Sequence, residues 1–204
     1  GEGMKRTSQA VIVLLIAIGA AGLTIGLQQL TAKPIAAQLR EMHSQALLDV
    51  LPLGSYDNQP LEQPLGITSG MLDNSQLLGG YRATLAGTPS AVVLRSQVDG
   101  YGGRIELLIA IDHNAKLLGV KTLEHRETPS MGGHIGEPGN AWLASFKGLS
   151  RENPQVWALK KDSGQFDQIA GATITSRAVI NAIHDALRYF DEHRQALLET
   201  TSHD

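Results

Sequence analysis

The longest uncharged run in this chain lies near its start and limits the folds open to it. Residues 10–27 read AVIVLLIAIGAAGLTIGL, with no charge and a single hydroxyl. As a helix rising about 1.5 Å per residue the run measures roughly 27 Å, and its flanks extend it to the ~30 Å of a bilayer's hydrocarbon core. We therefore expect a transmembrane helix over residues 10–30, after a short cytoplasmic N-terminus at residues 1–9.

A cleaved signal peptide is the alternative interpretation of this run. The apolar part of a signal peptide is usually about 7–15 residues long and ends at a small-residue cleavage site. Here the run is longer and continues into QQLTAKPIAAQL without such a site. Lys5 and Arg6 precede the span, and basic flanks stay in the cytoplasm. The sequence thus predicts a single-pass protein of the inner (cytoplasmic) membrane with its C-terminal domain in the periplasm.

Composition narrows the kinds of site and partner. The chain has no Cys, which excludes disulfides, thiolate metal sites, iron–sulfur clusters and c-type haem attachment. Its formal net charge is −3, and it has no basic stripe that would follow a phosphate backbone, so nucleic acid is not an expected partner. A hydrophobic content of 42% is enough for a packed core.

Residues 31–80 predict a membrane-proximal helix followed by an irregular connection. Pro34 suits the first turn of a helix. Apolar residues then recur near helical spacing up to Pro52; they are Ile35, Leu39, Met42, Leu47 and Val50. Residues 52–80 are rich in Pro, Gly, Asn and Ser, so we expect a surface connection without regular structure there.

Residues 81–204 predict an α+β domain. Apolar runs of strand length occupy 91–98, 104–111 and 116–122, and the sequence DHNA between the last two is a good hairpin turn. The middle run lacks strict alternation, which indicates a strand covered on both faces. A further strand is expected over VWALKKD, and helices over AWLASF and from Thr175 to Ala196. The expected fold is a mainly antiparallel sheet flanked by helices.

The stretch DQIAGATITSRAV, residues 167–179, has two interpretations. In the first, Thr175 or Ser176 caps the final helix and Gly171 relaxes the backbone before it. In the second, the free N–H groups and partial positive charge of the helix start receive a phosphate. Gly171 and Ala172 would let the phosphate reach the backbone. The Thr173 hydroxyl could then hydrogen-bond the phosphate or be esterified to it.

The residues DQIAGAT, 167–173, resemble the flavinylation motif of the FMN-binding domain family, an Asp followed by Ser/Thr-Gly-Ala-Thr. Residues 100–112, 118–133 and 157–183 are similar, in the same order, to the G subunits of Rnf electron-transport complexes. The resemblance covers essentially the whole chain. The related C subunits of sodium-translocating NADH:quinone reductases share this plan, but chain length and the segment KKDSGQFDQ favour the Rnf family.

The resemblance implies that FMN is held covalently, through a phosphoester on Thr173 added by a flavin transferase that uses FAD. The motif region supplies the candidate cofactor-binding residues Asp167, Gly171, Ala172, Thr173 and Thr175. Ala170 stands where the family often has Ser or Thr, so one hydroxyl that could bond the phosphate is absent. The implied role is an electron carrier among the other subunits of an ion-translocating ferredoxin/NAD oxidoreductase complex, with no independent catalytic activity.

Further flavin contacts are expected from outside the motif. The family often has Glu-Thr-Pro-Gly-Leu-Gly where this chain has ETPSMG, and this loop is expected to reach the flavin ring. Lys160 and Lys161 could approach the phosphate or the N1 edge of the flavin, where a cation stabilises the reduced, anionic flavin, although such a pair is more often a charged strand end in solvent. The additional candidates are Tyr101, Glu127, Thr128, Met131 and Lys160.

Other chemistries find less support in the sequence. Glu124, His125, Glu127 and His134 do not have the spacing of helix-face metal ligands, so no metal site is expected. No serine lies in a nucleophile elbow, and no catalytic residues are assigned. A membrane-tethered sensory or ligand-binding domain remains the alternative function. It would hold an anion non-covalently at the start of the final helix.

Overall fold

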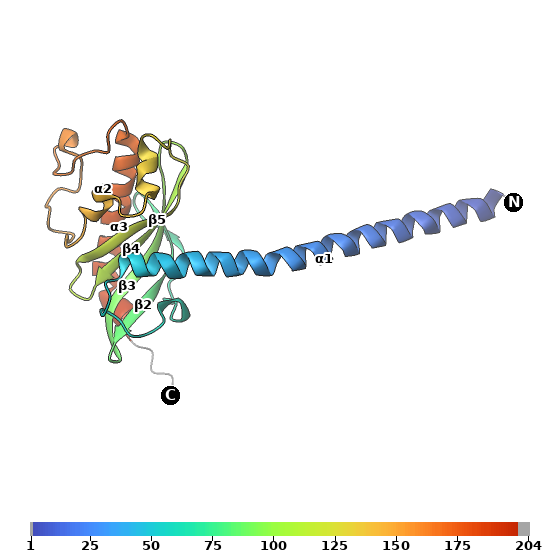
Figure 1. Cartoon of the computed structure of the whole chain (residues 1–204), viewed down its shortest axis with the longest axis horizontal. Helices are drawn as coiled ribbons and strands as arrows, with labels where there is room; N and C mark the ends of the chain where they lie inside the picture. The colour runs from blue at the N-terminus through green and yellow to red at the C-terminus, as the bar shows by residue number, and fades with distance from the viewer. Residues whose placement is uncertain (1, 200–204) are drawn as a thin grey trace. The chain divides into compact units, whose positions relative to one another are not determined.

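The computed structural model describes residues 2–199. The chain divides into two compact units, Gly1–Met42 and His43–Asp204. Helix α1, Glu2–Val50, supplies all of the described part of the first unit and enters the second. The second unit contains a five-stranded antiparallel sheet and the remaining helices (Figure 1). This arrangement confirms the predicted α+β class.

The N-terminal helix is longer than predicted. It is continuous over Glu2–Val50 and contains Pro34, so the membrane-proximal helix ends before Pro52 as expected but does not begin at Pro34. An interior proline loses one helical hydrogen bond and crowds the carbonyl four residues earlier, but the good helix formers around Pro34 (Ala, Gln and Leu) favour a helix on both sides of it. The helix is long and apolar enough to cross a membrane, and its most apolar window of 18 residues is 0% buried.

The sheet is a meander in which each strand pairs with the next along the chain. Its strands are β1 (Gly70–Met71), β2 (Gln76–Leu85), β3 (Thr88–Asp99), β4 (Arg104–Asp112) and β5 (Leu117–Glu124). The three predicted strands are confirmed as β3, β4 and β5. The Asp112–Lys116 turn closes the predicted hairpin, because Asp112 donates its N–H to the Lys116 carbonyl at 2.8 Å.

Two predictions about secondary structure were wrong. The segment expected to be irregular holds the 3-10 helix η1 (Pro60–Glu62), strand β1 and the start of β2. Strand β2 was not predicted because its glycines are typical of a loop. A side chain on Gly80 would lie 2.5 Å from the Val93 carbonyl of β3, so the close pairing of the two strands requires glycine there. The strand expected over VWALKKD is instead an isolated bridge, Leu159 to Phe166, with the 3-10 helix η3 (Lys160–Asp162).

Helix α3, Thr173–Leu198, forms the main core with one face of the sheet. Val179, Ile183 and Leu187 are all 0% exposed and belong to one cluster with Leu107 and Ile109 of β4. Leu108 and Ala110 of β4 point into a second cluster, formed with Leu47 and Val50 at the end of α1. Strand β4 is therefore covered on both faces, as predicted.

The start of α3 differs from the predicted cap. The helix begins at Thr173, its N-cap is Ala172, and no side chain caps it. Ser176 accepts from the N–H of Ile169 at 2.9 Å and donates to the carbonyl of Ala172 at 2.6 Å. Thr175 is buried. Neither hydroxyl is therefore the N-cap, and the start of the helix lacks the usual side-chain acceptor.

Candidate functional site

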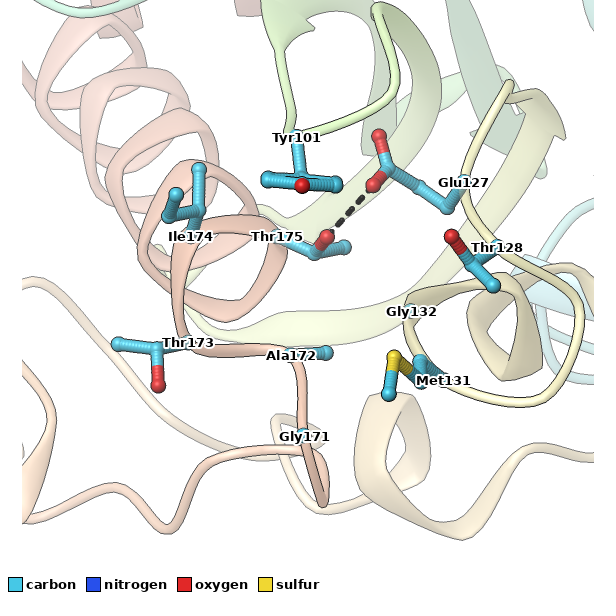
Figure 2. A pocket seen from close by; sticks show the side chains of 10 residues that line it. All are labelled: Tyr101, Glu127, Thr128, Met131, Gly132, Gly171, Ala172, Thr173, Ile174 and Thr175. Atoms are coloured by element: carbon cyan, nitrogen blue, oxygen red, sulfur yellow. Dashed lines mark hydrogen bonds between the residues drawn. The ribbon is translucent and has the colours of Figure 1, made fainter.

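A cavity of about 320 Å³ opens at the start of α3 (Figure 2). Three segments distant in sequence form its walls: the β3–β4 loop, the loop after β5, and the turn that begins α3. Its lining residues are Tyr101, Glu127, Thr128, Met131, Gly132, Gly171, Ala172, Thr173, Ile174 and Thr175. Volumes of this order are typical of small-ligand sites.

Thr173 is the first residue of α3 and is partly exposed. Its hydroxyl donates to Oε1 of Gln168 at 2.9 Å and accepts from Nζ of Lys161 at 3.0 Å. Gly171, just before it, has φ +69°, a left-handed conformation that favours glycine. The first amides of an α-helix have no acceptor within the helix. The turn thus presents a partly exposed hydroxyl, held by two polar side chains, at the start of the helix.

Thr175 is only two residues further along but lies in a different environment. It is 1% exposed, and its hydroxyl donates to Oε2 of Glu127 at 2.7 Å. Glu127 is itself 5% exposed, and both of its carboxylate oxygens lie 3.2 Å from the N–H of Gly102. This buried carboxylate therefore connects the three walls of the cavity through hydrogen bonds.

Glycines allow these walls to approach each other. A side chain on Gly100 would lie 2.2 Å from Oε1 of Glu127, and one on Gly132 would lie 2.6 Å from the hydroxyl of Thr175. Real side chains do not pack at such distances, so both positions require glycine to keep this geometry. Gly100 and Gly132 therefore allow the two loops to pack against the bonded pair of Glu127 and Thr175.

The mouth of the cavity is apolar. Tyr101, Met131 and Ile174 are 72%, 45% and 50% exposed, and Figure 2 shows them on different walls. Apolar side chains that are this exposed around a hollow are typical of ligand-binding sites. The cavity thus combines an apolar rim with a polar floor at Glu127 and Thr175.

The charged groups around Thr173 are mostly paired. Lys160 forms an ion pair with Asp167 at 2.8 Å. Arg177 donates to both oxygens of Asp162 at 2.7 Å, and this hydrogen bonding lowers the pKa of Asp162 and raises that of Arg177. Lys161 lies between these pairs in sequence and contacts Thr173.

Eight of the ten residues predicted from the sequence line this cavity. The other two, Lys160 and Asp167, border a separate hollow beside it. Sequence reasoning missed Gly132 and Ile174, and did not foresee the hydrogen bond between Gln168 and Thr173. Ile174 lies between the candidates Thr173 and Thr175, and this placement is the sequence signal that could have indicated it.

The four residues considered for a metal site separate into different contacts. His134 pairs with Glu137 at 2.7 Å, whereas Nδ1 of His125 accepts from the N–H of Glu127 at 3.1 Å. Within residues 2–199, no group of three or more His, Asp or Glu side chains is arranged to hold a metal ion.

Comparison with known proteins gives a consistent assignment. Residues 100–188 match the FMN-binding domain family. The G subunit of the ion-translocating oxidoreductase complex from Pseudomonas aeruginosa is 43% identical over 93% of this chain and 90% of its own length. Its counterpart from Shewanella piezotolerans is 39% identical over 96% of this chain and 95% of its own.

A solved structure, that of the C subunit of the Na⁺-translocating NADH-quinone reductase from Parabacteroides distasonis, is also similar. It is 23% identical, has a TM-score of 0.44, and the match covers 62% of this chain and 65% of that one. A likeness at this level carries no argument about function. The curated relatives carry the assignment, because each of the two aligns along nearly its whole length. This chain belongs to the family of ion-translocating oxidoreductase complex G subunits.

Proposed function

We propose that this chain carries FMN, bound covalently through a phosphoester on Thr173, and relays electrons within an ion-translocating oxidoreductase complex. The name of its relatives supports membership in such a complex, and the matched domain supports FMN as the cofactor. The chain acts as a redox subunit beside others and not as an independent enzyme. Its maturation requires a flavin transferase as a further partner.

The contrast between the two neighbouring threonines carries the proposal. Thr173 is partly exposed at the rim of the cavity, where a transferase can reach its hydroxyl. Thr175 is 1% exposed, and its hydroxyl is bonded to Glu127. Esterification of Thr175 would leave a buried carboxylate without that donor, at a cost of about 1–3 kcal/mol. The structure therefore favours Thr173 as the acceptor.

The residues present fit FMN. The small residues Gly171 and Ala172 leave the start of α3 open to a phosphate, whose charge the helix amides stabilise. The exposed apolar groups of Tyr101, Met131 and Ile174 provide surface for an aromatic ring system beside this turn. When bound, FMN supplies one- and two-electron redox chemistry. The protein holds it in place and sets its electrostatic surroundings.

Location in the inner membrane is part of the same proposal. The first unit has a helix of sufficient length and apolarity to span a bilayer. The cations Lys5 and Arg6 precede the apolar run, which favours a cytoplasmic N-terminus and a periplasmic C-terminal domain. Covalent attachment would keep the flavin from being lost on that side of the membrane.

The test is co-expression of the full-length chain with a flavin transferase. We expect a band that keeps flavin fluorescence after denaturing electrophoresis, and a flavin phosphate adduct on Thr173 in peptide mass mapping. Thr173→Ala should abolish the adduct, whereas Thr88→Ala, at an exposed strand end, should retain it. A wild-type band without fluorescence would favour the non-covalent binding domain, and an adduct on Thr175 would refute the assigned acceptor.

Orientation can be tested separately because the chain has no native cysteine. A single cysteine at the exposed position Gln155 provides a unique label site. We expect a membrane-impermeant maleimide to label Gln155→Cys in cells with a permeabilised outer membrane. Labelling only after the inner membrane is disrupted would place the domain in the cytoplasm.

A further inference from the structure

The hydroxyl of Thr173 has two polar neighbours with opposite roles. Its single proton is donated to Oε1 of Gln168 at 2.9 Å. The ammonium of Lys161 has donors only, so at 3.0 Å it must donate to the Thr173 oxygen. A positive charge is therefore in direct contact with the oxygen proposed to bind phosphorus.

A tight turn fixes the backbone position of Lys161. Lys161 lies in η3, and the residue after η3, Ser163, has φ +67°. A side chain on Gly164 would lie 2.0 Å from the Ala158 carbonyl, so the turn closes only with glycine there. The N–H of Gly164 donates to the Leu159 carbonyl at 2.9 Å. The turn is thus hydrogen-bonded internally, and Leu159 is buried in the core.

The neighbouring cations are held by carboxylates. Lys160 is paired with Asp167, and Arg177 occupies both oxygens of Asp162. Lys161 also lowers the pKa of Asp162, but less than Arg177 does. Lys161 is therefore the cation placed to act on the acceptor.

We propose that Lys161 is a positioning residue for flavin attachment, an inference that rests on the proposed function. In the attachment step, the Thr173 oxygen forms a bond to the riboflavin-side phosphorus of FAD. The bond from that phosphorus to the bridging pyrophosphate oxygen breaks, AMP leaves, and the hydroxyl proton passes to a base of the transferase. Lys161 donates to one lone pair of the Thr173 oxygen and so orients the other lone pair toward the phosphorus. The charge of Lys161 also stabilises the negative phosphoryl oxygens when FAD binds beside it.

The test measures the rate of attachment with the full-length chain, purified flavin transferase and FAD, followed by intact-protein mass. Lys161→Gln should slow attachment about tenfold, less than is typical for a fully buried donor because Lys161 is exposed to solvent. Lys161→Arg should recover most of the rate. The matched control is Lys147→Gln, an exposed lysine after α2 (Ala141–Ala144), which should match the wild type.

Ionic strength provides a second measurement. Raising the salt concentration should slow the wild type more than Lys161→Gln, because salt screens the charge that the variant lacks. Equal rates for Lys161→Gln and the wild type would overturn the inference while leaving the proposed function intact. If Lys161→Gln and Lys161→Arg slow attachment equally and both lower the unfolding temperature, the role of Lys161 is structural and the inference is overturned. Absence of any adduct on the wild type would overturn the proposed function itself.

Discussion

The hydrogen bond between Thr175 and Glu127 allows a quantitative test of how the cavity is held together. Thr175→Val keeps the shape of the side chain but removes the donor that lies 2.7 Å from Oε2 of Glu127. The carboxylate is 5% exposed, so water cannot readily replace that donor. Hydrogen bonds to charged groups contribute about 1.5–3 kcal/mol, and we expect the free energy of unfolding to fall by about 2 kcal/mol.

The measurement is thermal unfolding of the full-length chain in detergent, expressed without a flavin transferase. Trp142 and Trp157 are the two tryptophans of the chain and report on the second unit by fluorescence. For a unit of this size we expect the midpoint to fall by about 4–8 °C. Thr88→Val, on an exposed threonine, is the matched control and should change the free energy of unfolding by less than about 0.5 kcal/mol.

A double-mutant cycle decides whether the loss comes from this contact. Glu127→Gln is combined with Thr175→Val, and the coupling free energy should be about 1 kcal/mol or more, as for residues in one hydrogen-bonded network. Strictly additive effects would refute the reasoning, because they would mean that the two side chains contribute to stability independently.

Two further predictions concern packing and pH. Gly132→Ala places a methyl group 2.6 Å from the Thr175 hydroxyl and should destabilise the domain by about 1–3 kcal/mol, whereas Gly66→Ala, with open space around it, should not; equal midpoints for the two variants would contradict this. Burial lowers the pKa of His184, which stacks on Trp157. The unfolded chain therefore binds the proton more readily, and stability should decrease as pH falls below about 6.5. His184→Gln should reduce the dependence of the free energy of unfolding on pH, measured between pH 5 and 7. If that dependence is unchanged in the variant, His184 does not contribute to it.

The sequence predicted the parts of the fold that have a strong pattern. The continuous apolar run of β4 indicated a strand buried on both faces, and the stripe of apolar residues in α3 indicated its contact with the sheet. Strand β2 was missed because Gly79 and Gly80 resemble a loop. Their reason lies in the neighbouring strand, since Gly80 faces the Val93 carbonyl. A requirement set by a contact with another strand cannot be predicted from the residues of β2 alone.

The candidate site also has a part that could be predicted from local sequence and a part that depends on distant residues. The motif around Thr173 is local, so it could be recognised directly, and the resemblance brought in the loop that contains Glu127. The bond between Glu127 and Thr175 joins residues 48 positions apart and follows from no spacing. Thr175 was considered both as a helix cap and as a cofactor-binding residue; the cap role is excluded because α3 begins at Thr173 with Ala172 as its N-cap. Lys160 and Lys161 are both cations near the motif, and the structure distinguishes them, because Lys161 contacts Thr173 whereas Lys160 pairs with Asp167.

The range of the contacts at this site has a consequence for the order in which it forms. Lys161 and Gln168 lie only twelve and five positions from Thr173, whereas the bonds to Glu127 span 25 and 48 positions. Short chain segments close quickly and at low entropic cost, and long-range contacts form late. The contacts of the acceptor hydroxyl therefore carry a smaller loop-closure cost than the contacts of Glu127. The hollow beside it becomes complete only once three remote segments have met.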